Sequence, residues 1–269
     1  MRHPQWSYDA VLYEMNIRQL TTEGTLRAAA EQLPRLAGLG IDAVWLMPVY
    51  PIGRLNRKGS LGSYYSIADY CDINPEIGTL VDFDYFVDKA HSLGIKVILD
   101  WVANHTARDA KWLTDKPADW YKRDENGNAL IPWDWSDTAQ LNYDNRDVWQ
   151  GQIEAMKFWV TEHNIDGFRC DMAMLVPIEF WQVVRFSLQQ IKPDIFLLAA
   201  RELGLPAKAC AVVEDAKNGI LAAHRAGCYP ILVPDLYPPA EEILPLLWHR
   251  AGSLWEIPAL VRAHNEGRA

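Results

Sequence analysis

The feature that most constrains the fold is the regular alternation of short apolar runs with amphipathic helical patterns. The apolar runs are strand-like, and they occur at residues 11–17, 43–49, 96–102 and 167–173. Helical patterns separate or follow them at residues 25–39, 80–93, 148–163 and 177–191. Continuous apolar runs are typical of parallel strands covered on both faces by helices. The alternation therefore predicts an α/β fold of parallel β/α units, and four such units make the N-terminal half of a TIM (β/α)8 barrel.

A long segment rich in Trp and Asp, residues 106–144, follows the third strand-like run. Such a segment is too long for a simple connection between a strand and a helix, and long loops of this kind are often functional. In a barrel the loops at the carboxyl ends of the strands build the active site. We therefore expect this segment to take part in a site at that end of the sheet.

Polar side chains mark the ends of the third and fourth runs. Asp100 and His105 come at the end of the third run, and Arg169 and Asp171 lie within the fourth. Residues two apart on a strand point to the same side, so Arg169 is expected to lower the pKa of Asp171 and keep it ionised. An ionised, oriented carboxylate is what a glycosidic nucleophile requires. The alternative is a structural ion pair, but we expect all four residues to cluster at one end of the sheet.

Two motifs resemble the signatures of the alpha-amylase family of glycoside hydrolases. The first is Asp100 followed by apolar positions and then Asn104-His105, and the second is the run Gly-Phe-Arg-x-Asp-x-Ala at residues 167–173. The stretches at residues 40–48, 65–70 and 74–79 resemble the second strand of that family and the loop after it. The resemblance covers residues 11–191, and it implies a TIM barrel that cleaves α-glucosidic bonds.

The resemblance also implies roles for individual residues. Asp171 would be the nucleophile and Arg169 would orient it. His105 would bind a sugar hydroxyl, Tyr65 would stack beneath the sugar ring, and Asp100 would be a structural acid at the site. Asn104 would be a ligand in those members that bind calcium. For His105 and Tyr65 the alternative is ordinary packing.

The second carboxyl group that a retaining glycosidase needs is missing from its expected place. It lies about 5 Å from the nucleophile, and in the family it is a Glu directly after the fifth strand. The run at residues 196–199 resembles that strand, but Ala200 stands where the Glu is expected and Glu202 comes two positions later. The Asn-His-Asp signature of the seventh strand is absent from the sequence.

The remaining residues, 193–269, resemble the terminal part of a haloacid dehalogenase-like phosphatase. The runs 193–206 and 210–219 carry this resemblance, and it implies that Glu214 and Asp215 bind magnesium and that Lys192 binds phosphate. The alternative for the acidic pair is a solvated turn. On this basis we expect a helix at 195–204 and a strand at 209–213, and the Asp-x-Asp nucleophile motif of that family is missing.

The sequence thus predicts a chimera of a half barrel, residues 1–192 with an insertion at 106–144, and a Rossmann-like phosphatase-fold fragment, residues 193–269. If residues 209–213 replace the fifth barrel strand, Glu214 would face Asp171 as an acid. The predicted function is retaining hydrolysis of α-glucosidic bonds, crippled by the missing Glu. The alternatives are a chimera without efficient turnover and, ranked last, a magnesium-dependent sugar-phosphate phosphatase or mutase.

The net charge and the distribution of apolar residues limit the kinds of partner and location that are expected for the chain. A formal net charge of −9 argues against nucleic acid and is compatible with a neutral substrate such as an α-glucan or maltooligosaccharide. The sequence shows neither an apolar signal core at its beginning nor a stretch long enough to span a membrane, so a soluble cytoplasmic protein is expected. Too few strands for a closed barrel would leave open sheet edges, through which a homodimer could form.

Overall fold

The computed structural model describes residues 4–198, 211–215, 217–234 and 240–266. The chain divides into two compact units, Met1–Ala199 and Ala200–Ala269. None of the helices in the described ranges is long and apolar enough to cross a membrane.

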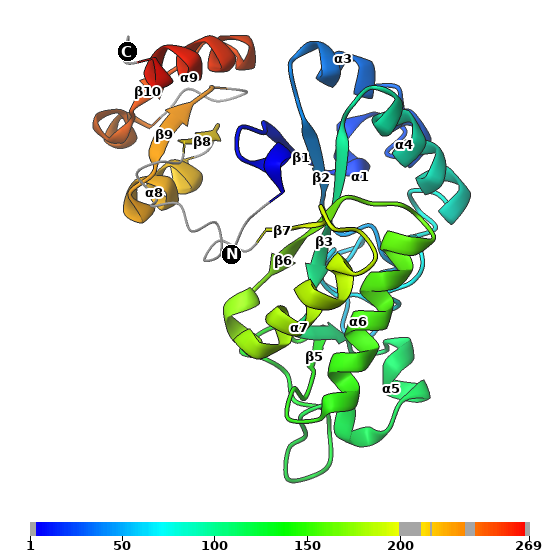
Figure 1. Ribbon diagram of the computed structural model, residues 1–269. Helices are drawn as coiled ribbons and strands as arrows, with labels where there is room; N and C mark the ends of the chain where they lie inside the picture. Colours follow the sequence, from blue (N-terminus) through cyan, green and yellow to red (C-terminus); the bar gives the residue numbers. More distant parts are fainter. Residues whose placement is uncertain (1–3, 199–210, 216, 235–239, 267–269) are drawn as a thin grey trace. The chain divides into compact units, whose positions relative to one another are not determined.

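The first unit is built on a five-stranded parallel sheet with the order β1-β2-β3-β6-β7 (Figure 1). Its strands are β1 (Leu12–Met15), β2 (Ala43–Leu46), β3 (Lys96–Val102), β6 (Gly167–Asp171) and β7 (Phe196–Leu198). Its α-helices are α1 (Ile17–Leu20), α2 (Leu26–Ala30), α3 (Leu33–Gly38), α4 (Leu80–Ser92), α5 (Lys111–Asp115), α6 (Arg146–Thr161) and α7 (Ile178–Gln189). Short 3-10 turns are η1 (Gln5–Ser7), η2 (Ala118–Trp120) and η3 (Ala173–Leu175). The predicted parallel β/α architecture is therefore present, with one strand more than the sequence suggested.

The helix predicted at residues 25–39 is wrong in one respect, because the structure has two short helices there. The helix α2 begins at the cap Thr25, whose side chain accepts a hydrogen bond from the Ala28 amide, and it ends at Ala30. The helix α3 then starts with Pro34 in its first turn. Proline lacks an amide hydrogen and is tolerated only in that first turn, so a single continuous helix is excluded.

The prediction of a helix at residues 195–204 is also wrong over Phe196–Leu198. These residues form β7, which pairs in parallel with β6 so that Gly167 faces Phe196. Gly167 fits closely here, because a Cβ on it would lie 2.3 Å from the Phe196 carbonyl oxygen. Pairing with β6 thus overrides the helix-forming tendency of the sequence that follows, and residues 199–204 lie outside the described residues.

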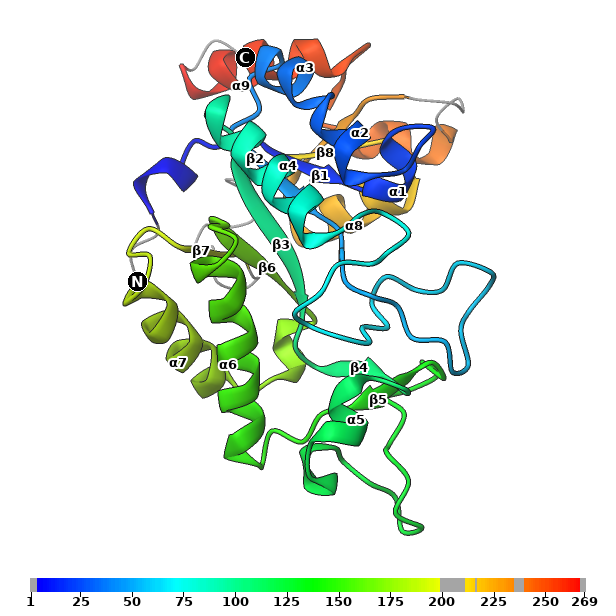
Figure 2. The same cartoon turned by 90° about the vertical axis from the view of Figure 1, so that its right-hand side faces the viewer.

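The segment 106–144 is an ordered insertion. It contains an antiparallel pair of strands, β4 (His105–Ala107) and β5 (Thr138–Gln140), together with α5. Figure 2 shows these elements beyond the end of β3, on the side where the carboxyl ends of β3 and β6 lie. The insertion is thus placed to form one wall of a site at that end.

The core of the first unit contains a cluster of aromatic side chains. Tyr50, Tyr70, Trp101 and Trp159 are buried and touch one another, with ring centroids 4.9–6.3 Å apart. Their polar atoms are satisfied: for example, Trp101 Nε1 donates to Gln152 Oε1 over 2.8 Å. Aromatic packing of this kind stabilises the fold, and it accounts for part of the high Trp content without any role in binding.

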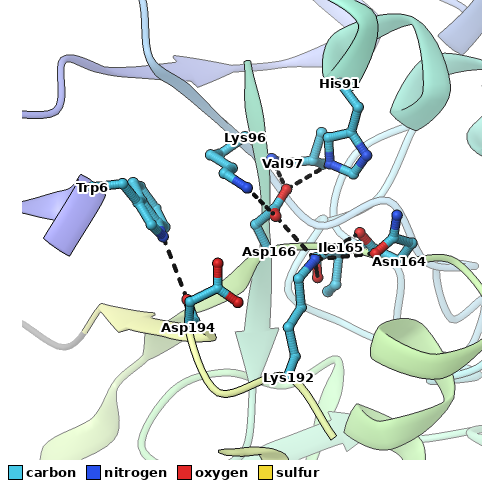
Figure 3. Close-up of polar contacts among 9 residues, drawn as sticks. All are labelled: Trp6, His91, Lys96, Val97, Asn164, Ile165, Asp166, Lys192 and Asp194. Carbon is cyan, nitrogen blue, oxygen red and sulfur yellow. Dashed lines mark hydrogen bonds and ion pairs between the residues drawn. The ribbon is translucent and has the colours of Figure 1, made fainter. Parts of the chain in front are cut away.

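Asp166, which lies directly before β6, contacts two lysines and a histidine at the amino end of the sheet (Figure 3). Its buried carboxylate accepts hydrogen bonds from His91 Nε2 over 2.7 Å, from Lys96 Nζ over 3.0 Å and from Lys192 Nζ over 2.9 Å. Burial by itself would raise the pKa of Asp166, but hydrogen bonds from His91, the Val97 amide and Lys192 outweigh it and hold the pKa well below its usual range.

The same contacts correct the expectation for Lys192. Its ammonium also donates to the backbone carbonyls of Asn164 and Ile165, over 3.2 and 2.9 Å. An ammonium has three donors, and these contacts occupy them. Lys192 is therefore a structural residue of the first unit, and its assignment as a phosphate-binding lysine is wrong.

The second unit has a three-stranded parallel sheet of order β10-β9-β8. Its elements are β8 (Ala211–Glu214), α8 (Lys217–Ala226), β9 (Tyr229–Leu232), η5 (Glu241–Leu246), β10 (His249–Arg250), η6 (Leu254–Glu256) and α9 (Ile257–Asn265). A small core of Ile220, Leu232 and Ile243 joins α8, β9 and η5. The β-α-β order of β8, α8 and β9 agrees with the predicted α/β fragment.

Candidate active site

Two neighbouring strands bring three ionisable side chains together. Arg169 on β6 faces Asp100 on β3 in the strand register, and Asp171 lies two residues further along β6. A single guanidinium nitrogen of Arg169, Nη1, donates to Asp100 Oδ2 over 3.0 Å and to Asp171 Oδ1 over 2.8 Å. Arg169 therefore links the two carboxylates in the way that their places in the sequence suggested.

Asp100 is fully buried, and its environment favours the protonated form. Burial raises its pKa to about 7, and the charge of Asp171 adds to this effect while Arg169 opposes it. Trp45 Nε1 and the Tyr65 hydroxyl lie 3.2 and 3.4 Å from Asp100 Oδ2 and can donate to the carboxylate. Near neutral pH Asp100 is therefore partly protonated, and its carboxyl group can both take up and release a proton.

The electrostatics of Asp171 differ from the prediction. Arg169 does lower the pKa of Asp171, but burial has the larger effect, so the pKa is raised above its ordinary value. The expectation that Arg169 would depress this pKa is therefore wrong in its net sign. The reason is that desolvation of a half-enclosed carboxylate disfavours its charge more than one shared cation favours it.

His105 begins β4, directly after the turn that ends β3, and it is buried. Burial lowers its pKa to about 4, although a hydrogen bond with the Tyr65 backbone offsets part of the shift. The ring is therefore neutral at pH 7. Asn104 Nδ2 lies 3.2 Å from His105 Nδ1, and in this assigned orientation the amide donates to Nδ1, so that Nε2 carries the proton.

A cavity of about 270 Å³ opens at this end of the sheet. Three of the predicted residues, Tyr65, His105 and Asp171, line it. The other lining residues come from the loops after β2 and β6 and from the insertion after β3, which includes β5, and they are Lys58, Ser63, Trp135, Asp137, Thr138 and Met172. Trp135, Asp137 and Thr138 belong to the segment 106–144 that was expected to take part in the site, whereas Lys58, Ser63 and Met172 were missed; the signal that could have found these three was their place in the loops after the strands.

The loop after β6 begins with a sharp turn at Met172. This residue has a φ of 47°, in the left-handed region that a side chain as large as Met rarely adopts. The turn ends the strand directly after Asp171 and brings Met172 to the wall of the cavity. Strained backbone of this kind is common beside functional groups.

The carboxylates of the second unit do not join this sheet. The strand β8, which ends at Glu214, pairs with β9, and β7 occupies the fifth place in the five-stranded sheet. The hypothesis that residues 209–213 replace the fifth barrel strand is therefore wrong. Instead the Glu214 side chain folds back locally, where its Oε2 accepts the Asp215 amide over 3.0 Å. Ala200 and Glu202 lie outside the described residues.

The predicted metal ligands, Asn104, Glu214 and Asp215, do not belong to a larger cluster of His, Cys, Asp or Glu side chains in the described part of the chain. Calcium takes six to eight oxygen ligands, and magnesium also favours carboxylates. Within the described ranges no group of three or more His, Cys, Asp or Glu side chains is arranged to hold a metal ion. The amide nitrogen of Asn104 is directed at His105, and the assignment of Asn104, Glu214 and Asp215 as metal ligands stays a prediction.

Comparison with known proteins matches two families to different parts of the chain. The family model for the alpha amylase catalytic domain matches residues 13–194. The model for haloacid dehalogenase-like hydrolases matches residues 177–227. The two matches overlap at 177–194, a range that contains α7 and ends just before β7.

Several relatives are similar to the chain over most of its length. Alpha-amylase 3 of Dictyoglomus thermophilum is 31% identical over 226 residues, which is 72% of this chain and 43% of that protein. An alpha-1,4-glucan:maltose-1-phosphate maltosyltransferase of Arcanobacterium haemolyticum is 35% identical over 199 residues, or 66% of this chain and 28% of that protein. An alpha-amylase structure from Lactobacillus plantarum matches with a TM-score of 0.68 and 32% identity, over 97% of this chain and 56% of that one. The chain thus spans less than half the length of these two sequence relatives.

Proposed function

The chain belongs to the alpha-amylase family, and we propose that it acts on α-glucosidic bonds through Asp171, with slow turnover of natural α-glucans. The observation that carries this proposal is the cavity in which Asp171 lies with Tyr65 and His105, while Arg169 joins it to Asp100. The relatives include an alpha-amylase and a maltosyltransferase that uses an α-1,4-glucan. An α-glucan or maltooligosaccharide is therefore the substrate class that we propose.

Each residue of the cavity has a role in the proposed reaction. The Tyr65 ring provides an apolar face for a sugar, and burial raises the pKa of its hydroxyl so that it stays neutral. Neutral His105 binds a sugar hydroxyl. A carboxylate oxygen of Asp171 attacks C1 of the sugar, the C1–O bond breaks, and the leaving oxygen takes the electron pair. Water then attacks C1 and the bond between C1 and Asp171 breaks; solvent takes up the proton that the water loses and supplies the one that the leaving oxygen gains.

The limiting feature is the proton that the leaving oxygen needs. General acid catalysis contributes about 10²- to 10⁴-fold to such a step. The sequence places Ala200 where the family has its acid, and Glu202 lies two positions later. We therefore propose that a natural α-glucan, whose leaving sugar needs that proton, reacts slowly, whereas an aryl glucoside with a good leaving group reacts readily.

A second candidate is a fold chimera that binds sugar without efficient turnover. The overlap of two family matches at residues 177–194 and the division into two compact units support this alternative. In this case Asp171 and Glu214 would be inherited residues that do not act together. The assay with an aryl glucoside, described at the end of this section, distinguishes the two candidates.

A magnesium-dependent phosphatase activity is the lesser alternative. It would rest on Glu214 and Asp215 at the end of β8. The Asp-x-Asp motif that supplies the nucleophile in that family is absent from the sequence, and without a nucleophile the covalent step cannot begin. We rank it below both other candidates.

Self-association through the sheet edges is a further proposal. Among the described strands, β1 and β7 are the outer members of the five-stranded sheet, and the outer strands of a sheet can pair with another chain. Light scattering coupled to size-exclusion chromatography would show a dimer if this is correct. A monomeric mass across the accessible concentration range would contradict it.

The proposed activity is tested with 4-nitrophenyl α-glucoside and maltotetraose, using the full chain and Asp171→Asn as the control. We expect release of nitrophenol that the control abolishes, little glucose from maltotetraose, and faster turnover of the aryl glucoside with added azide. Azide attacks C1 without needing a general base, so it can replace water. Robust glucose release that depends on Asp171 would contradict the slow step. Absence of nitrophenol release would instead support the chimera without turnover.

A further inference from the structure

The wall of the cavity formed by the insertion has features that the proposed reaction does not use. Trp135, Asp137 and Thr138 line the same cavity as Asp171, and all three come from the segment 106–144. The ring of Trp135 lies 5.2 Å from the ring of His105. An aromatic ring therefore lies beside His105, the residue that we propose binds a sugar hydroxyl.

A second Trp extends this surface toward solvent. The rings of Trp133 and Trp135 have centroids 4.8 Å apart and are inclined by 52°. Trp133 is 64% exposed, and its backbone φ of 51° is in the left-handed region. A large exposed aromatic ring and a left-handed backbone at a bulky residue are both unfavourable for folding. Folding stability therefore does not explain why Trp stands at this position.

A polar edge accompanies the aromatic surface. Lys58 Nζ lies 3.5 Å from Asp137 Oδ1, and both residues line the cavity. Asp137 is only 2% exposed, and its Oδ2 has no hydrogen-bond partner among the residues that the structure describes. Flat apolar faces next to a few fixed polar groups suit a pyranose ring, which has apolar C–H faces and hydroxyls on its rim.

We propose that Trp135 and Trp133 bind the second and third sugar rings of a maltooligosaccharide, beyond the ring held by Tyr65 and His105. The Lys58–Asp137 pair would bind hydroxyls along the same stretch. An α-1,4-linked glucan is curved, so its successive rings are inclined to one another, as the two Trp rings are. A flat β-1,4-linked chain would fit the inclined pair poorly. This assignment rests on the proposed function, since it extends the same site.

The test compares binding of maltose, maltotetraose and cellotetraose by isothermal titration calorimetry. In Trp133→Ala we expect the affinity for maltose to stay within about twofold and that for maltotetraose to fall about three- to tenfold. The matched control is Phe186→Ala, since Phe186 on α7 is 67% exposed and does not line the cavity. Trp133→Phe should recover much of the loss, because it keeps an aromatic face. Cellotetraose should bind weakly to every form.

A second measurement uses the unaltered protein, so it does not depend on how a variant folds. Hydroxyl-radical oxidation read by mass spectrometry should label Trp133 in the free chain and in the presence of maltose. Maltotetraose should protect it. Trp255, which is 63% exposed in the second unit, serves as the internal standard and should be labelled throughout.

The outcomes distinguish a failure of the proposed function from a failure of the roles assigned to Trp133 and Trp135. If the chain binds no maltooligosaccharide, the proposed function fails and this assignment fails with it. If maltose binds but maltotetraose neither binds more tightly nor protects Trp133, only the assignment is overturned. Equal losses in Trp133→Ala and Phe186→Ala, or protection of Trp255 together with Trp133, would also overturn it.

Discussion

Asp100 should make the stability of the first unit fall as the pH rises from about 4 to 7. Burial raises its folded-state pKa to about 7, whereas in an unfolded chain an Asp has a pKa of about 3.9. Between these values the folded state binds more protons than the unfolded state. The stabilisation from this proton is therefore complete below about pH 4, and it is lost as the pH rises through 7.

The substitution Asp100→Asn tests this directly, because an amide does not ionise and Asp100 is fully buried. For a group with these two pKa values, the wild type should lose roughly 2–3 kcal/mol of unfolding free energy between pH 5 and pH 8. The variant should lack that loss. Urea unfolding of both proteins, followed by Trp fluorescence at the two pH values, measures the difference.

Asp166→Asn provides a matched control, because Asp166 is also a buried Asp and lies directly before β6 of the same sheet. His91, the Val97 amide and Lys192 hold its pKa well below the usual range, against the effect of burial. It is therefore ionised at both pH 5 and pH 8, and the substitution should cost about 3–5 kcal/mol at each. If Asp100→Asn also changes stability equally at the two pH values, the account of Asp100 as a desolvated acid is refuted.

Two further predictions concern the fifth strand and the sugar-binding histidine. Phe196→Ala should lower the unfolding free energy by about 3 kcal/mol, because Phe196 is 6% exposed in β7 and its ring lies 5.2 Å from that of Trp6; a loss no larger than that of the exposed Phe186→Ala, measured by denaturant titration, would contradict this. His105→Ala should weaken maltose binding by a similar factor at pH 5.5 and pH 8, because burial lowers the pKa of His105 to about 4; a factor that changes steeply over this range in calorimetry would show that the ring titrates there.

The sequence was sufficient for the parallel β/α units and for the position of the charged cluster. Both follow from local signals: continuous apolar runs for the strands, and polar residues at their carboxyl ends. Asp100, Arg169 and Asp171 meet because the register of β3 and β6 aligns them. The sign of the pKa shift at Asp171 could not be predicted, since it depends on how far the side chain is desolvated.

Strand β7 shows why other features of the fold could not be predicted from the sequence. The run Phe196–Leu198 precedes strong helix formers, and both families that it resembles use a similar string there. Only pairing with β6 decides in favour of a strand. The cavity wall from Lys58, Trp135 and Asp137 likewise depends on where two long loops fold, which local patterns do not determine.

The measurement that tests the central claim most directly is covalent trapping at Asp171. A fluorinated α-glucosyl fluoride carries a leaving group that needs little acid help: a carboxylate oxygen of Asp171 attacks C1, the C–F bond breaks and fluoride departs. Intact-mass and peptide mass spectrometry should find one glycosyl group on the peptide that contains Asp171, and the adduct should persist because the water step is slow. Asp171→Asn should remain unlabelled. A wild-type chain that stays unlabelled, or a variant that is labelled equally, would contradict the assignment of Asp171 as the nucleophile.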